Sequence, residues 1–257
     1  MRLNVDWLWS KLKDKHLEEL VRGALGFFNL RLLGTVCGYV FIYFVSHWYG
    51  AEVVGIYAIS IAALRIGLLY GRMGLDNALV RFIAEYAAKG RKDFVKQVYL
   101  RGLGASIPVS LGISLLLYFC APLLAKEVFN NPALVTTLRI IALVILPGTL
   151  LHINASTLRG LKRTASYSFL INASQFLLGS LILILGKSFL EENSAPVMAF
   201  AAATVAAALI SFGFGAVPRK GEMVSGETRE GAIRTWGLMK VAFPMLLTGS
   251  YAFSLQW

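Results

Sequence analysis

The sequence predicts an all-α fold, a polytopic transmembrane helical bundle, and three observations support this. Hydrophobic residues make up 57% of the chain and the mean hydropathy is +0.65, whereas a soluble domain is about 45–50% apolar. A bilayer core of about 30 Å requires about 20 helical residues, and Lys and Arg fall mainly in every second gap between stretches of that length. Six such stretches run through the chain: 24–48, 54–71, 102–125, 134–158, 166–186 and 195–217.

The basic residues also predict which side of the membrane each connection occupies. The N-terminal segment and the second, fourth and sixth connections carry twenty of the 25 Lys and Arg residues. The first, third and fifth connections carry only Lys126 and Lys187. Because basic loops stay in the cytoplasm, we expect a multi-pass protein of the cell membrane with a cytoplasmic N-terminus. This bias accounts for the net charge of +11 without a nucleic-acid partner.

The chain divides into four predicted segments. The connections predicted to lie outside the cell are short. They leave no room for an enzyme domain there, and we predict no enzymatic activity. The longest cytoplasmic connection, Met73–Arg101, should contain an amphipathic helix with Leu79 and Ile83 on its apolar side. The segments are an interfacial segment at 1–23, a six-span lobe at 24–217, a cytoplasmic linker at 218–236 and an incomplete seventh span at 237–257.

Two arginines inside spans are the first candidates for a substrate site. Charged groups in a span are costly in hydrocarbon and usually functional. Arg31 is followed by Gly34 and Gly38 on its own face, so we expect it to face protein or a cavity rather than lipid. Arg65 should lie at a similar depth, and a guanidinium fork fits phosphate oxygens. The alternative is that both side chains extend to the interface, which suits Arg139, near the outer end of its span, better.

The positions of the acidic residues indicate which kind of substrate the spans could bind. The chain has fourteen Asp and Glu residues, and none lies in the middle of a predicted span. A site for a cation or a cationic drug would need such groups, so an arginine-bearing lobe favours an anionic substrate. No pair of residues has metal-ligand spacing, and we predict no metal and no cofactor. The two cysteines, Cys37 and Cys120, are expected to be packing residues.

A polar stripe in the fifth span gives two further candidates. Its members Ser168, Asn172, Gln175 and Gly179 share one helix face. Asn172 and Gln175 could hydrogen-bond the hydroxyls of a sugar. Equally, they could bond to a neighbouring helix, a common role of amides in membranes. His152, in the fourth span, is expected to be a hydrogen-bonded packing residue, with a proton-sensing role as the alternative.

Four motifs in order resemble one family. Residues 49–57 are YGAEVVGIY, residues 74–86 are GLDNALVRFIAEY, residues 158–163 are LRGLKR, and residues 242–244 are AFP. Together they resemble the polysaccharide-export flippases (Wzx-like) of the multidrug/oligosaccharidyl-lipid/polysaccharide exporter superfamily. The resemblance covers the whole chain.

The resemblance implies a transporter of two six-helix lobes that moves lipid-(di)phosphate-linked oligosaccharides to the outer leaflet. The implied partners are that substrate, membrane lipids, and a second lobe or the polysaccharide polymerase machinery. The chain matches the N-terminal half, and we expect it to be a fragment that does not transport alone. The alternatives are a multidrug-type cation antiporter lobe, a non-transporting gene remnant, and a polytopic glycosyltransferase, which the short external loops disfavour.

Overall fold

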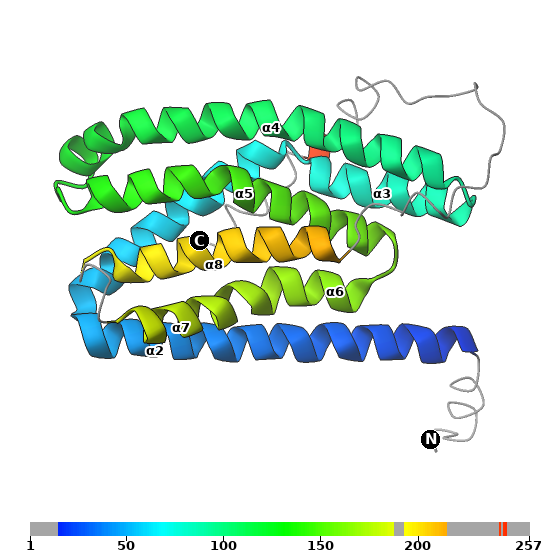
Figure 1. Cartoon of the computed structure of the whole chain (residues 1–257), viewed down its shortest axis with the longest axis horizontal. Coiled ribbons are helices and arrows are strands. Elements are labelled where there is room, and N and C mark those ends of the chain that lie inside the picture. The colour runs from blue at the N-terminus through cyan, green and yellow to red at the C-terminus, as the bar shows by residue number, and fades with distance from the viewer. Residues whose placement is uncertain (1–14, 188–192, 215–241, 243, 246–257) are drawn as a thin grey trace, which may run out of the picture.

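The computed structural model describes residues 15–187, 193–214, 242 and 244–245, and these residues form a bundle of long helices (Figure 1). No strand occurs in this part of the chain. The elements are α2 (Lys15–Arg72), α3 (Leu75–Ala88), α4 (Lys92–Leu123), η1 (Leu124–Val128), α5 (Leu134–Gly160), α6 (Thr164–Ser168), η2 (Phe169–Ala173), α7 (Ser174–Gly186) and α8 (Ala195–Gly213). The described residues include five helical stretches that are long and apolar enough to cross a membrane. The predicted all-α membrane bundle is therefore confirmed.

The first two predicted spans are the two legs of one element, α2. Gly50 interrupts this helix with φ 83° and ψ 177°, a conformation that glycine adopts without the strain of a side chain. The chain reverses there, and the legs diverge from this point (Figure 1). The expected external connection Tyr49–Val53 is thus reduced to a break at one residue, because helical backbone resumes at Ala51.

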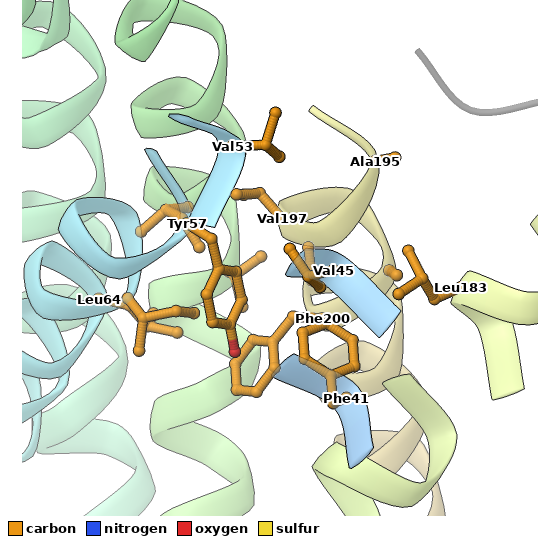
Figure 2. Close-up of a cluster of buried hydrophobic side chains, with 14 of the residues drawn as sticks. Phe41, Val45, Val53, Tyr57, Leu64, Leu183, Ala195, Val197 and Phe200 are labelled. Atoms are coloured by element: carbon orange, nitrogen blue, oxygen red, sulfur yellow. The ribbon is translucent and has the colours of Figure 1, made fainter. Parts of the chain in front are cut away.

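An aromatic and aliphatic cluster holds the two legs together near Gly50. Phe41 of the first leg packs against Tyr57 of the second, with ring centroids 5.4 Å apart. Tyr57 in turn contacts Phe200 of α8 at 6.1 Å. Figure 2 shows these three rings gathered together, and Val45 and Leu183 belong to the same buried cluster. Burial of these side chains fixes the end of the bundle at which α2 turns, which is the predicted outer side.

The amphipathic helix predicted between the second and third spans is confirmed as α3. Its residues Leu75, Leu79 and Ile83 are buried, whereas Arg81 and Glu85 are exposed. The helix packs closely on its neighbours. A methyl group at Gly160 of α5 would come within 2.9 Å of Ile83, and one at Gly102 of α4 within 3.0 Å of Leu79. Glycine at both positions lets α3 lie directly against α4 and α5.

The structure covers the predicted segments unevenly. Residues 1–14 of the expected interfacial segment lie outside the described residues, as does the whole expected linker, 218–236. Only residues 242, 244 and 245 of the expected seventh span are described. Among them, Ala242 is buried in the apolar cluster that α3 and α4 share.

Candidate functional site

Arg31 lies on the exposed side of the first leg of α2, beside a very close helix crossing. A methyl group at Gly34 would overlap the carbonyl oxygen of Asn172, and one at Gly38 would lie 3.7 Å from Phe176. The two glycines therefore let α2 pack directly on η2 and α7. The guanidinium of Arg31 is not part of this packing, because the residue is exposed one turn before Gly34.

Arg65 is also exposed, on the second leg of α2. A helix rises 1.5 Å per residue, which places Arg31 about 28 Å and Arg65 about 22 Å along their legs from Gly50. Both arginines therefore lie in the half of the bundle away from Gly50, with Arg65 somewhat deeper. On the same face as Arg65, Ala58 is exposed and Ala62 is half-buried, so small side chains surround its base.

The polar stripe of the fifth span is tied to the first span. Ser168 donates from Oγ to the backbone carbonyl of Phe27 at 3.1 Å. The side-chain amide of Asn172 donates to Ser168 Oγ at 3.1 Å. At the other end of the stripe, Gly179 accommodates the ring of Phe41. Ser168 thus bonds to a neighbouring helix, the alternative left open for this stripe, whereas the side-chain bond of Asn172 stays within its own span. A substrate contact of Asn172 or of the half-buried Gln175 stays a prediction.

The fifth span also contains a π-helical turn that the sequence does not predict. Residues Phe169–Ala173 form one wide π-helical turn, η2, between α6 and α7. Such turns are rare and occur mostly at functional sites. Here the wide turn presents the backbone of Asn172 to Gly34, so it shapes the crossing beside Arg31.

A second polar cluster joins α2, α3 and α5. Arg72 donates from Nη1 to Asp76 Oδ2 at 2.9 Å and from Nε to the Leu68 carbonyl at 2.9 Å. The same Nη1 lies 3.3 Å from His152 Nδ1. Because a guanidinium only donates, Nδ1 of His152 must accept here, so the proton of a neutral ring sits on Nε2. His152 is therefore a hydrogen-bonded packing residue, as expected from its sequence context.

A buried network centred on Asn154 was missed by the sequence reasoning. Tyr99 donates from its hydroxyl to Asn154 Oδ1 at 2.7 Å, and Asn154 Nδ2 donates to Ser211 Oγ at 2.7 Å. All three side chains are buried. The network connects α4, α5 and α8. The only available signal was a lone Asn inside an apolar span, since its two partners are far away in the chain.

Two cations near the outer end of the bundle rest on aromatic rings. Arg139 lies over Tyr118 at 5.3 Å from the ring centroid, and Lys187 lies over Trp48 at 4.3 Å. Such contacts are worth about 0.5–1 kcal/mol at exposed sites. They suit the interfacial role expected of Arg139.

The apolar helices, with Arg31 and Arg65 exposed on the two legs of α2, define a polytopic membrane protein with charged groups set inside its spans. The chain matches the family model described as "Polysaccharide biosynthesis protein" over residues 20–253, and it belongs to that family. Membership supports a polysaccharide-related transporter role. The expected relation to the polysaccharide exporters is thereby confirmed at the level of the family. No curated protein and no solved structure matches the chain.

Proposed function

We propose that this chain is a lobe of a transporter that flips lipid-(di)phosphate-linked oligosaccharides from the cytoplasmic to the outer leaflet for polysaccharide biosynthesis. The observation that carries the proposal is the exposure of Arg31 and Arg65 inside the spans of α2. Insertion scales give about 2.5–3.5 kcal/mol for an arginine at the centre of a membrane helix. The cost falls toward the interface, so it is smaller at the depth of Arg65 than at the centre. An aqueous path or a partner surface would remove what remains of it.

A second lobe would supply that partner surface. In transporters that alternate between two open states, two helical units move against each other around a shared site. The two legs of α2 are joined near Gly50 and diverge toward the side predicted to be cytoplasmic (Figure 1). In this proposal, Arg31 and Arg65 hold the phosphate groups on that side, where the substrate enters. Guanidinium forks suit this role because they match phosphate oxygens in pairs.

A cation antiporter is the less favoured alternative. None of the fourteen Asp and Glu residues lies in the middle of a predicted span. Within the described spans, the charged side chains singled out above are arginines. A cationic drug would meet repulsion rather than attraction at such a site.

The decisive experiment measures transport of two kinds of substrate in membrane vesicles that contain the chain in its native host membrane. One substrate is a fluorescent polyprenyl-diphosphate saccharide and the other is a cationic dye. Arg65→Ala should reduce saccharide flipping by about ten-fold or more, because a hydrogen bond to a charged group is worth roughly 1.5–3 kcal/mol. Arg139→Ala is the matched control and should leave flipping unchanged. Dye transport that depends on the chain would favour the antiporter. Because the chain is expected to need a second lobe, the vesicles must also contain that lobe, and absence of both activities in such vesicles would favour a non-transporting remnant.

A further inference from the structure

The turn between α5 and α6 gathers positive charge at one point of the surface. Arg159, Lys162 and Arg163 fall within five residues, and all three are exposed. The residues between them are Gly160 and Leu161, so the turn contains no acid. Three cations so close together repel one another, and a bound anion would relieve that repulsion.

Backbone hydrogen bonds close this turn. Lys162 adopts a left-handed conformation with φ 61°. The amide of Lys162 donates to the Arg159 carbonyl at 3.0 Å, and the amide of Arg163 donates to the Leu158 carbonyl at 2.9 Å. The three basic side chains therefore project from a defined scaffold.

Contacts within the protein also orient the guanidinium groups of Arg159 and Arg163. Arg159 lies over the ring of Tyr167 at 5.4 Å, and Tyr167 stacks on Phe27 of α2 at 6.4 Å. Arg163 donates from Nη1 to the carbonyl of Phe214 at 3.1 Å, at the end of α8. Neither contact neutralises a charge, and each guanidinium keeps further N–H groups for a ligand.

The position along α5 places the turn at the level of lipid phosphates. Arg159 follows Leu134 by 25 residues, which corresponds to about 37 Å along the helix axis. The hydrocarbon core is about 30 Å thick, so Arg159 reaches into the headgroup region. Its ring partner Tyr167 suits the same level, since aromatic residues gather at the interface.

Lys89, another basic residue at a predicted cytoplasmic turn, differs from these three because an acidic side chain pairs with it. Lys89, at the end of α3, pairs with Glu85 at 2.6 Å. That hydrogen bond lowers the pKa of Glu85, so the glutamate is ionised at neutral pH and balances the lysine. In the described part of the chain, neither ion pair involves the α5–α6 turn.

We propose that Arg159, Lys162 and Arg163 form a binding site for the phosphate of an anionic phospholipid in the cytoplasmic leaflet. A resident phospholipid fits better than a transported substrate, because both guanidinium groups are already held by the protein rather than free to follow a moving ligand. The bound lipid would also link α5, α6 and the end of α8. This site is independent of the proposed transport function.

Native mass spectrometry of the full chain tests the proposal. The chain is purified with an equal mixture of phosphatidylglycerol and phosphatidylcholine, and the lipids that remain bound are counted. We expect selective retention of phosphatidylglycerol, and a loss of about ten-fold or more in the double variant Arg159→Gln/Arg163→Gln. Lys89→Gln is the control and should retain as much as the unmodified chain.

Other results would overturn the proposal. Equal retention of both lipids, or an equal loss in Lys89→Gln, would mean general attraction to charge rather than a site. Retention of an endogenous polyprenyl diphosphate in place of phosphatidylglycerol would assign the turn to the substrate instead. If the double variant fails to fold, two other measurements still test the site. These are lipid retention by the Arg159→Lys variant and a salt titration of the unmodified chain. Phosphatidylglycerol that stays bound at high salt, or that is lost fully from Arg159→Lys, would contradict an electrostatic site.

Discussion

Arg72 and Asp76 form a 2.9 Å ion pair across the sharp turn that separates α2 from α3. Between them, Met73 and Gly74 both have positive φ, 49° and 71°. Each side chain of the pair is about one fifth exposed, at 19% and 22%. Since the same guanidinium also reaches His152 of α5, one arginine fixes the turn and attaches it to the centre of the bundle.

The first prediction is that Asp76→Ala destabilises the chain by about 1–3 kcal/mol, because it leaves a half-buried guanidinium without its anion. The matched control is Glu85→Ala, which breaks an ion pair of the same spacing between exposed side chains and should have a much smaller effect, because water screens exposed pairs. Thermal unfolding of both variants in detergent measures the difference. Equal losses of stability in the two variants would show that the Arg72–Asp76 pair stabilises the chain no more than an exposed ion pair does.

The second prediction concerns the buried network of Asn154. Asn154→Ala removes both of its hydrogen bonds at once and should cost about 1–2 kcal/mol, given that bonds between membrane helices average about 0.6 kcal/mol. Tyr99→Phe removes one of them and should cost about half as much. Unfolding of the two single variants and the double variant forms a cycle. Fully additive effects would mean that Asn154 and Tyr99 do not act together.

The third prediction tests the crossing of α2 and η2. Gly34→Ala places a methyl group on the carbonyl of Asn172, so the helices must separate, at a cost of about 1–3 kcal/mol. Gly26→Ala, in the same helix, meets nothing within 4 Å and should be neutral or slightly stabilising, because alanine favours a helix over glycine. A stability loss in Gly26→Ala as large as that in Gly34→Ala would argue against close packing at this point.

The sequence was sufficient for the all-α membrane bundle of long apolar helices, the amphipathic helix α3 and the packing roles of Gly34, Gly38 and His152. These features depend on local composition and helical periodicity, which a single sequence displays. The reversal at Gly50 was expected as a loop of several residues, because helical propensity around a glycine does not reveal that one residue suffices. Periodicity likewise gave no sign of η2, since one inserted residue shifts the pattern only locally.

The polar networks were harder to predict than the helices. The sequence places Asp76 in the predicted cytoplasmic connection Met73–Arg101 but gives no sign that it pairs with Arg72, which also reaches His152 of α5. The partners of Asn154 are 55 and 57 residues away along the chain. Such pairings follow from helix packing, which has no local signature. Arg31 was expected to point toward protein or a cavity because Gly34 and Gly38 share its face, whereas Arg31 and Arg65 are both exposed in the structure.

The fourth prediction is topological and follows from the basic residues. Single cysteines at Ala51 and Asn130, in a background without Cys37 and Cys120, should react with an impermeant thiol reagent from outside the cell. Both positions are exposed. Cysteines at Lys92 and Lys162, also exposed, should react only after the membrane is opened. Labelling of Lys162→Cys in intact cells would overturn the predicted cytoplasmic location of the α5–α6 turn.

The last prediction separates phosphate binding by Arg31 from simple extension of its side chain to the interface. If its guanidinium binds a phosphate, Arg31→Ala in a full-length version of the protein should reduce polysaccharide export about ten- to a hundred-fold, as expected for loss of a charged hydrogen bond worth roughly 1.5–3 kcal/mol. Arg31→Lys should also be impaired, because lysine keeps the charge but lacks the paired donors. A side chain that only reaches the interface predicts instead that lysine works as well as arginine. Thr35→Val is the control, since Thr35 bonds only to the Arg31 carbonyl in its own helix. Export is compared with the membrane abundance of each variant, and full activity of Arg31→Ala would leave Arg65 as the remaining arginine candidate in α2.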